Sequence, residues 1–104
     1  MEFKVKFSDC DSYKVVHNSN YIAWFEDNLY HELCGSKEVD IEIEILNIRC
    51  RYLQSAKYNQ QLVINTDIEK IAENRYSFKQ ILIDKETKKR LGFSGGEYIV
   101  HTRV

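Results

Sequence analysis

Two aspartates separated by one residue, Asp9 and Asp11, stand shortly before a segment that can begin a helix. Asn18, Ser19 and Asn20 follow, and each is a residue type that caps the start of a helix well. The unpaired N–H groups and the positive dipole end of a helix can stabilise a developing oxyanion. A carboxylate beside such a helix start indicates a site that attacks and polarises a carbonyl group.

The other reactive side chains of this segment are weaker candidates for catalysis or metal binding. His17 could act as a general acid, but a loop histidine beside a helix cap is more often incidental. Cys10 lies between two carboxylates, which would raise rather than lower the pKa of its thiol, so a nucleophilic cysteine is disfavoured. Asp9, Asp11 and His17 lack a recognised metal-ligand spacing, so no metal site is expected. Asp9 itself is expected to be structural.

The composition narrows the classes of function. A length of 104 residues predicts one domain, spanning 1–104. The formal net charge of -1 lacks the basic field of a nucleic-acid-binding protein, so no nucleic-acid partner is expected. No apolar run approaches the ~18 residues of a membrane span, so no membrane association is expected. The cysteines Cys10, Cys34 and Cys50 are odd in number and widely spaced, which favours free thiols and a cytoplasmic location.

A strand and a helix must position the catalytic candidates. Residues 1–7 alternate between apolar and polar side chains, which predicts a half-buried strand with Phe3, Val5 and Phe7 facing inward. A helix of about 15 residues is predicted next, ending near Gly35. Its inward stripe is expected to consist of Ile22, Phe25, Leu29 and Leu33, widened by Tyr21 and Trp24.

After the helix the period changes to two, which predicts a series of strands. In residues 41–52 the apolar positions change parity, so we expect a β-bulge near Ile45 to Asn47. Further strands are predicted at 61–71, 76–83 and 90–104, the last interrupted by Gly95 and Gly96. Leu62, Ile64 and Ile68 are expected to share one face of the 61–71 strand.

This order of elements predicts the fold class. One strand, one helix and four consecutive strands with short connections favour an α+β fold with a five-stranded antiparallel sheet wrapped around one long helix. The small residues Gly92, Ser94, Gly95 and Gly96 are expected to let the helix approach the sheet closely.

Two segments of the chain match a known family pattern. The first segment carries most of the match, through these residues: Phe7, Asp9, Asp11, Val15, Val16, Asn18, Tyr21, Phe25 and Glu26. The second segment, Tyr52 to Leu62, looks like a "Y…A-R/K-Y-G-D-x-L" pattern. In these residues the chain resembles the hotdog-fold acyl-coenzyme A thioesterases, specifically the group similar to 4-hydroxybenzoyl-coenzyme A thioesterase.

The resemblance implies roles for particular residues. Asp11 would be the catalytic carboxylate, and the backbone N–H of Asn18 would stabilise the oxyanion. Members of the group are dimers or tetramers with the site at a subunit interface, so a homodimer or homotetramer is expected. Lys57 occupies a position where the group has a basic residue. The remaining candidates for substrate binding are Tyr13, Tyr21, Tyr58 and Arg75.

The chain also departs from the pattern of the group. Ser12 to Lys14 stand where a glycine is common, and a helix arginine is replaced within the stretch Asp27 to Leu29. Asn59 and Gln60 replace the glycine and aspartate of "Y-G-D". Asparagine can adopt a positive φ almost as glycine can, so the turn is expected to persist.

The favoured interpretation is a thioesterase that hydrolyses an acyl-coenzyme A or an acyl-carrier-protein thioester. Asp11 would serve as nucleophile or general base, which the sequence does not separate. No metal or redox cofactor is expected, and coenzyme A would enter only as part of the substrate. The alternatives are a non-catalytic hotdog module that binds acyl thioesters, and a hotdog dehydratase or hydratase that would use His17.

Overall fold

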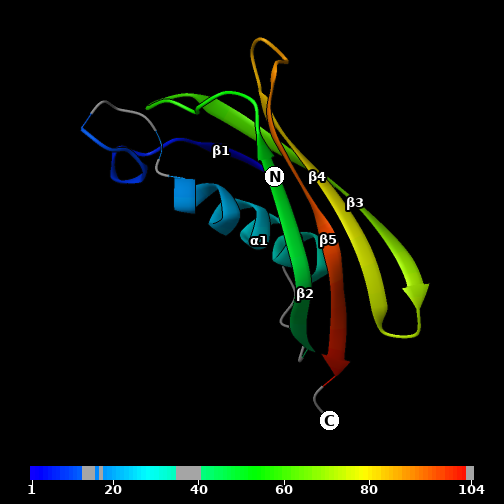
Figure 1. The fold of residues 1–104 in the computed structure, drawn as a ribbon. Helices are drawn as coiled ribbons and strands as arrows, with labels where there is room; N and C mark the ends of the chain where they lie inside the picture. Colours follow the sequence, from blue (N-terminus) through cyan, green and yellow to red (C-terminus); the bar gives the residue numbers. More distant parts are fainter. Residues whose placement is uncertain (13–15, 17, 35–40, 103–104) are drawn as a thin grey trace.

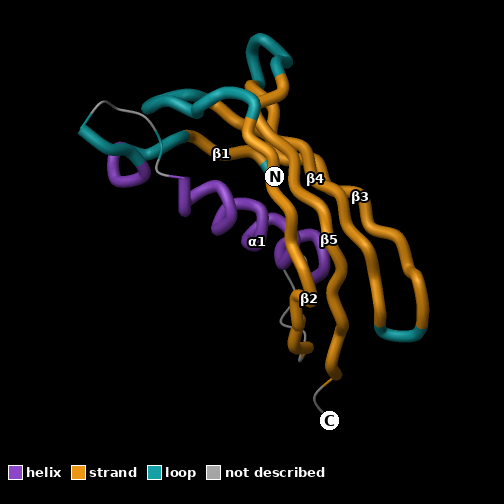
Figure 2. Tube along the Cα trace, viewed as in Figure 1, coloured by secondary structure: helices purple, strands orange, loops and turns teal. Residues whose placement is uncertain are grey.

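The computed structural model describes residues 1–12, 16, 18–34 and 41–102. The strands form one antiparallel five-stranded sheet in the order β1-β3-β4-β5-β2, and α1 lies across one face of it (Figure 1). The expected α+β architecture is therefore confirmed, with one helix layer against one sheet layer (Figure 2). The elements are β1 (Glu2–Lys4), a 3₁₀ helix η1 (Phe7–Asp9), α1 (Asn18–Cys34), β2 (Ile41–Tyr52), β3 (Gln61–Ala72), β4 (Arg75–Asp84) and β5 (Arg90–Thr102).

The inward face of α1 differs by one position from the predicted stripe. Tyr21, Phe25 and Leu29 are buried as a helical spacing requires, and they pack among the buried side chains of the sheet. Ile22 was expected in this stripe, but 38% of it is exposed because Tyr21 takes the inward position at the first turn. Burial of an aromatic ring here removes more apolar surface than an isoleucine would.

A polar layer, which the sequence did not predict, lies between the helix and the sheet. Thr66, Gln80 and Ser94 stand side by side on β3, β4 and β5, all facing α1. The Gln80 Nε2 group donates to the backbone oxygen of Phe25 at 2.8 Å, and the Ser94 hydroxyl donates to Gln80 Oε1 at 3.2 Å. Asn28, fully buried on α1, accepts a hydrogen bond from the Thr66 hydroxyl. These directional bonds define where α1 sits along the sheet.

Two predictions about the ends and glycines of the strands were wrong. β1 ends at Lys4 and the chain turns into η1, so Phe7 points outward with 68% of its surface exposed. β5 runs without a break through Gly95 and Gly96. Of the small residues, Gly92, Ser94 and Gly96 lie on the face towards α1 as expected, whereas Gly95 pairs with Arg49 and Lys79 on the face away from it.

The predicted β-bulge is confirmed. The pairing of β2 with β5 shifts register between Ile45 and Asn47, so Ile45 and Ile48 both face α1. Gly96 makes this bulge possible. A Cβ atom built on Gly96 would lie 2.1 Å from the backbone oxygen of Asn47, a distance that no side chain tolerates.

The contact between Gly96 and the bulge gives a test of stability. Gly96→Ala forces the bulge to shift, so we expect the free energy of unfolding to fall by about 1–3 kcal/mol in a denaturant titration. Gly95→Ala is the matched control. Its Cβ would meet only the Phe78 backbone oxygen at 3.5 Å, so its stability should be unchanged or higher by up to about 1 kcal/mol. Equal effects of the two substitutions would contradict this explanation of the bulge.

Candidate active site

The segment with the two aspartates forms a short loop against the start of α1. The 3₁₀ helix η1 leads into Cys10, which pairs antiparallel with Val16 in an isolated bridge. This bridge closes the loop that begins with Asp11, a partly buried residue. Tyr13 and His17, two further candidates from this loop, lie outside the described residues, and Asn18 is the first residue of α1.

Asp9 fixes the loop to the elements on both sides of it. Its carboxylate accepts a hydrogen bond from the Lys6 backbone N–H at 2.9 Å, and its backbone oxygen accepts one from Asn20 Nδ2 at 3.0 Å. Asn20 belongs to the first turn of α1, so the loop is tied directly to the helix start. This arrangement agrees with the expectation that Asp9 is structural.

The backbone of Ala56 joins three segments that are distant in sequence. The Ala56 N–H donates to the hydroxyl of Tyr21 at 2.7 Å, and the Ala56 backbone oxygen accepts from the Val16 N–H at 3.0 Å. Ala56 is fully buried, so neither bond is exposed to water. The two bonds link the end of the Asp11 loop and the first turn of α1 to the connection between β2 and β3.

Tyr21 therefore acts within the described structure as a bracing residue. Only 2% of it is exposed, which leaves little surface for the direct substrate contact that the sequence suggested. Burial raises the pKa of the Tyr21 hydroxyl, although the hydrogen bond from Ala56 opposes that shift. The hydroxyl stays protonated at neutral pH and can accept the Ala56 N–H while it donates its own proton.

Tyr52, at the end of β2, is an aromatic residue near the site that sequence reasoning did not select. Its ring lies 4.8 Å from that of Tyr21, centroid to centroid, and 40% of its surface is exposed. Burial, with the Cys50 thiol beside it, raises the pKa of Tyr52 to about 12. Its inward parity on β2 was detectable from the sequence, but its contact with Tyr21 depends on the tertiary fold.

The thiol of Cys10 is not set up as a nucleophile. Its pKa is raised, mainly by burial and further by the negative charges of Asp9 and Asp11. The sequence predicted the effect of the two carboxylates. Cys10 and Cys50 are both free thiols.

The Lys57-to-Gln60 turn keeps its shape despite its unusual residues. Asn59 has a φ of 72°, which confirms that it replaces glycine in the left-handed region. Gln60 accepts from the Lys57 N–H at 3.0 Å and donates from Nε2 to Asp84 Oδ2 at 2.6 Å. An amide can do both because it carries a donor and an acceptor.

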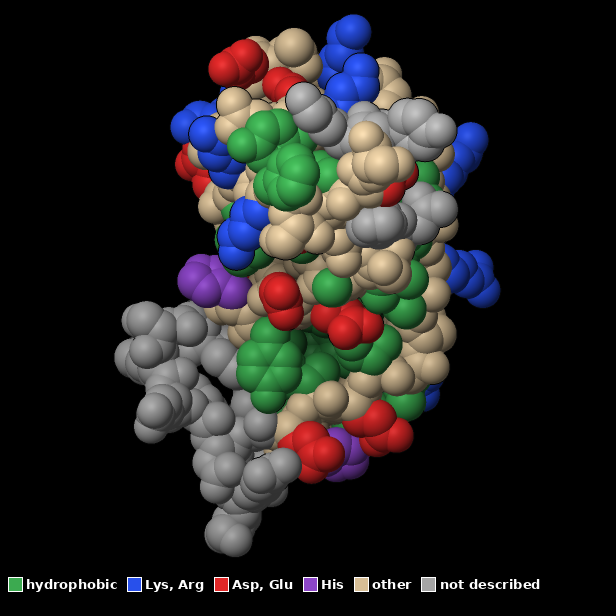
Figure 3. Space-filling view, turned by 90° about the vertical axis from the view of Figure 1, so that its left-hand side faces the viewer, with side chains coloured by type: hydrophobic (Ala, Val, Ile, Leu, Met, Phe, Trp, Pro, Cys, Tyr) green, Lys and Arg blue, Asp and Glu red, His purple; other side chains and the backbone are tan. Residues whose placement is uncertain are grey.

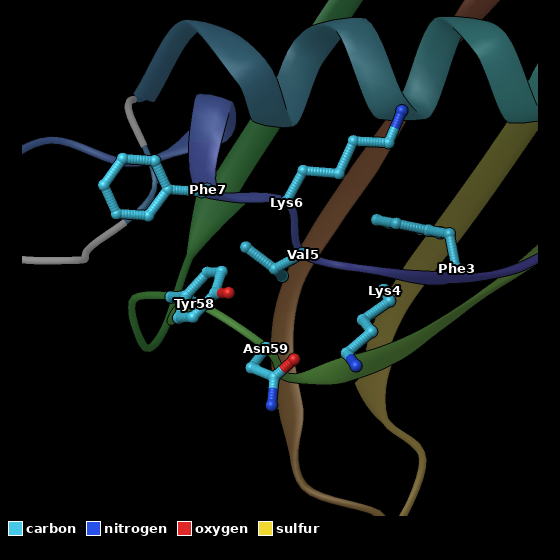
Figure 4. A pocket seen from close by; sticks show the side chains of 7 residues that line it. All are labelled: Phe3, Lys4, Val5, Lys6, Phe7, Tyr58 and Asn59. Carbon is cyan, nitrogen blue, oxygen red and sulfur yellow. The ribbon is translucent and has the colours of Figure 1, made fainter.

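Tyr58 belongs to a groove between β1 and this turn. The groove has a volume of about 380 Å³ and is lined by the residues shown in Figure 4: Phe3, Lys4, Val5, Lys6, Phe7, Tyr58 and Asn59. The Tyr58 ring meets that of Phe7 edge to face at 5.7 Å, and Lys6 turns towards α1. The side chain of Lys57 is exposed beside the groove. Tyr58 and Lys57 thus lie at the same end of the molecule as the Asp11 loop.

Arg75 is not brought to this end within one chain. It begins β4, whereas Asp84, which contacts the Lys57-to-Gln60 turn, ends that strand. Ten residues of strand separate the two by about 30 Å. Arg75 instead pairs with Glu97 at 2.6 Å. It could contact a substrate at the Asp11 loop only from another subunit.

The described residues form neither of two other kinds of site, a metal centre or a membrane-spanning helix. No three His, Cys, Asp or Glu side chains in the described part of the chain gather as a metal-binding group would. None of the described helices has the length and apolar character needed to cross a bilayer.

Comparison with known proteins gives consistent matches. The sequence profile described as "Thioesterase-like superfamily" matches residues 5–103. A protein of Aquifex aeolicus (strain VF5), named provisionally as an esterase, is 24% identical over 91 residues, which are 80% of this chain and 70% of that protein.

Solved structures share the fold. A gentisyl-coenzyme A thioesterase superposes with a TM-score of 0.85 at 18% identity, covering 99% of this chain and 88% of that one. A 1,4-dihydroxy-2-naphthoyl-CoA thioesterase from Synechocystis gives a TM-score of 0.83 at 12% identity, covering 100% of this chain and 82% of that one. The fold of the chain is therefore the hotdog fold.

The bond between Tyr21 and Ala56 predicts a loss of stability on removal of the hydroxyl. Tyr21→Phe leaves a buried N–H without a partner, so the free energy of unfolding should fall by about 1–3 kcal/mol in a denaturant titration. Tyr58→Phe, at a ring 44% exposed, is the control and should change it by less than about 0.5 kcal/mol. A Tyr21→Phe protein as stable as this control would show that the bond does not hold the site together.

The ionised carboxylate of Asp84 should stabilise the fold at neutral pH and lose this contribution in acid. Backbone N–H donation from Thr87, then the Gln60 side chain, holds the pKa of Asp84 below its ordinary value. A depressed folded-state pKa contributes stability above the unfolded value of about 3.9, and that stability is lost as the pH falls through the lower folded value. Urea titrations at a series of pH values measure this effect. The free energies of unfolding of Asp84→Asn and of the unsubstituted protein should therefore differ least at the lowest pH. A difference that grows towards low pH would contradict this assignment.

Proposed function

The chain belongs to the thioesterase-like superfamily, and we propose that it hydrolyses an acyl-coenzyme A thioester, or the acyl-carrier-protein equivalent, at the Asp11 loop. The observation that carries the proposal is the attachment of this loop to the start of α1, directly through Asn20 and Asp9 at 3.0 Å and indirectly through Ala56, which bonds Val16 at 3.0 Å and Tyr21 at 2.7 Å. These bonds hold a carboxylate-bearing loop beside the end of a helix where backbone N–H groups are unpaired.

The proposed reaction uses both the Asp11 carboxylate and the backbone N–H at the start of α1. In the general-base form, Asp11 removes a proton from water as the water oxygen attacks the carbonyl carbon of the thioester. The carbonyl oxygen becomes an oxyanion and accepts a hydrogen bond from the Asn18 N–H. The C–S bond then breaks, the carboxylic acid leaves, and the thiolate takes the proton held on Asp11.

In the nucleophilic form, an Asp11 oxygen attacks the carbonyl carbon directly and the thiolate departs. Water then hydrolyses the mixed anhydride, returning the carboxylate. Single-turnover hydrolysis in ¹⁸O-labelled water identifies the nucleophilic form if the label appears in Asp11. The label enters Asp11 only if water attacks the Asp11 carbon of an anhydride.

Oligomer formation is part of the proposal. β2 is an edge strand of 12 residues, and an open edge of that length is a site for pairing with another chain. Leu46, Tyr52 and Leu53, on or directly after this strand, are each about two-fifths or more exposed. The side of the molecule seen in Figure 3 also shows hydrophobic side chains at its surface between acidic ones. A homodimer or homotetramer would cover such surfaces, and a second copy could supply Arg75 to the substrate.

The remaining roles in the proposal are secondary. Lys57 and Tyr58 would contact the coenzyme or carrier portion of the substrate, and Tyr13 and His17 would complete the loop. The reaction as proposed uses no metal or redox cofactor. In the described part of the chain Cys10 and Cys50 are free thiols, which supports a reducing compartment, and on that basis we propose a cytoplasmic location. A non-catalytic acyl-binding module is the second candidate, favoured by the absence of the helix arginine.

The proposal predicts the effect of removing one carboxylate. Asp11→Asn should lower kcat by roughly 10²–10⁴ on those members of a panel of aryl- and alkyl-coenzyme A thioesters that the protein hydrolyses. Release of free thiol is the measurement. Asp27→Asn, at an exposed position of α1, removes a carboxylate of the same type elsewhere and should leave kcat unchanged.

Three outcomes separate the candidates. Hydrolysis that survives Asp11→Asn would refute the role of Asp11. Tight binding of the thioesters without turnover would favour the acyl-binding module. Addition of water to an enoyl thioester would favour a hydratase.

A further inference from the structure

The face of the sheet opposite α1 carries a row of three residues on adjacent strands. Arg49 of β2 pairs with Gly95 of β5, and Gly95 pairs with Lys79 of β4. Two strand spacings place the Cα atoms of Arg49 and Lys79 about 10 Å apart, with no side chain between them. A shallow hollow of about 580 Å³ lies over this row, and Ser77 and Asn47 also line it.

The fold does not explain why residue 95 is glycine. A Cβ on Gly95 would meet one atom, the Phe78 backbone oxygen, at an ordinary contact distance of 3.5 Å. Its φ does not lie in the left-handed region either. The neighbouring Gly96, by contrast, is required by the bulge. Glycine within a strand weakens it, and such a glycine often marks a place where a ligand approaches the backbone.

The two cations beside Gly95 are not held in ion pairs within the described part of the chain, although Asp67 stands opposite Lys79. Among the described residues, neither Arg49 nor Lys79 takes part in an ion pair. The one carboxylate lining the hollow, Glu97, is already paired with Arg75 at 2.6 Å. Asp67 faces Lys79 from β3, on the side away from the hollow. The hollow therefore has two positive side walls, a hydroxyl from Ser77 and an open backbone floor.

We infer that this hollow binds a phosphate group, with Arg49 and Lys79 on either side of it and Gly95 beneath. An arginine can bind two phosphate oxygens through its forked N–H groups, and a lysine adds a mobile point charge. Both side chains are long enough to converge above a residue that has no side chain. A larger residue at position 95 would occupy the space that the phosphate oxygens need.

Two sources could supply this phosphate, and they are chemically alike at the site. One is inorganic phosphate, and the other is the nucleotide end of coenzyme A. The hollow lies on the opposite face of the sheet from α1, so a coenzyme A molecule bound here would extend from the Asp11 loop of another subunit. Only the second source depends on the proposed function.

Binding to the full chain tests the inference without any turnover. Inorganic phosphate, adenosine 3′,5′-bisphosphate and coenzyme A are titrated by calorimetry in a phosphate-free buffer of low ionic strength. Arg49→Ala and Gly95→Val should each weaken binding by about tenfold or more. Lys70→Ala, which removes a positive charge from the other face of the sheet, is the matched control and should leave binding unchanged.

The stability of Gly95→Val separates loss of a ligand site from loss of the fold. A β-branched residue suits a strand, so this variant should melt at the same temperature or higher while it binds phosphate poorly. Equal binding by Gly95→Val and the unsubstituted protein would overturn the inference, as would an absence of binding for all three probes. Failure to hydrolyse thioesters would leave it untouched.

The relative affinities identify the source. Binding of adenosine 3′,5′-bisphosphate and coenzyme A at least tenfold tighter than that of inorganic phosphate would assign the site to the nucleotide. In that case Arg49→Ala should raise KM for an acyl-coenzyme A but not for the acyl-pantetheine that lacks the nucleotide. Similar affinities for all three would assign it to a free phosphate group.

Discussion

The two hydrogen bonds of the Ala56 backbone are the constraint on which the candidate site depends. They join the Tyr21 hydroxyl and the Val16 N–H, at 2.7 Å and 3.0 Å, to one fully buried residue. Such bonds are worth more as constraints than as sources of net stability, because each replaces a bond to water. Their loss, however, would leave buried polar groups without partners. The loop that carries Asp11 is thereby held in place relative to α1 by the connection between β2 and β3.

The polar layer under α1 also fixes the position of the helix relative to the sheet. Gln80 holds the Phe25 backbone oxygen, and Thr66 holds the side chain of Asn28. An apolar layer would pack equally well at several positions of the helix along the sheet, whereas directional bonds favour one. The amide groups at the start of α1 are consequently placed by contacts in the middle of the helix as well as by those at its first turn.

Periodicity alone predicted much of the fold. The parity change at Ile45 to Asn47 revealed the bulge because a strand cannot change faces without an extra residue. The turn at Asn59 was expected from the family resemblance instead, because asparagine can adopt the positive φ of the glycine that it replaces. The errors fell where tertiary contacts decide. Ile22 and Tyr21 are neighbours on α1, and the hydrogen bond to Ala56 places Tyr21 rather than Ile22 in the interior. Phe7 continues the alternation of residues 1–7, but the strand has already ended and Phe7 begins η1.

Less of the candidate site than of the fold could be predicted from the sequence. The segment containing Asp9 and Asp11 could be selected from residue types, but the role of Ala56 could not, since alanine carries no chemical signal. The most direct test is an experimental structure with a non-hydrolysable acyl-coenzyme A analogue in which a methylene group replaces the sulfur. We predict that the carbonyl oxygen lies about 2.7–3.2 Å from the Asn18 nitrogen, with the Asp11 carboxylate facing the carbonyl carbon directly or through one water. A carbonyl bound away from both groups would contradict it.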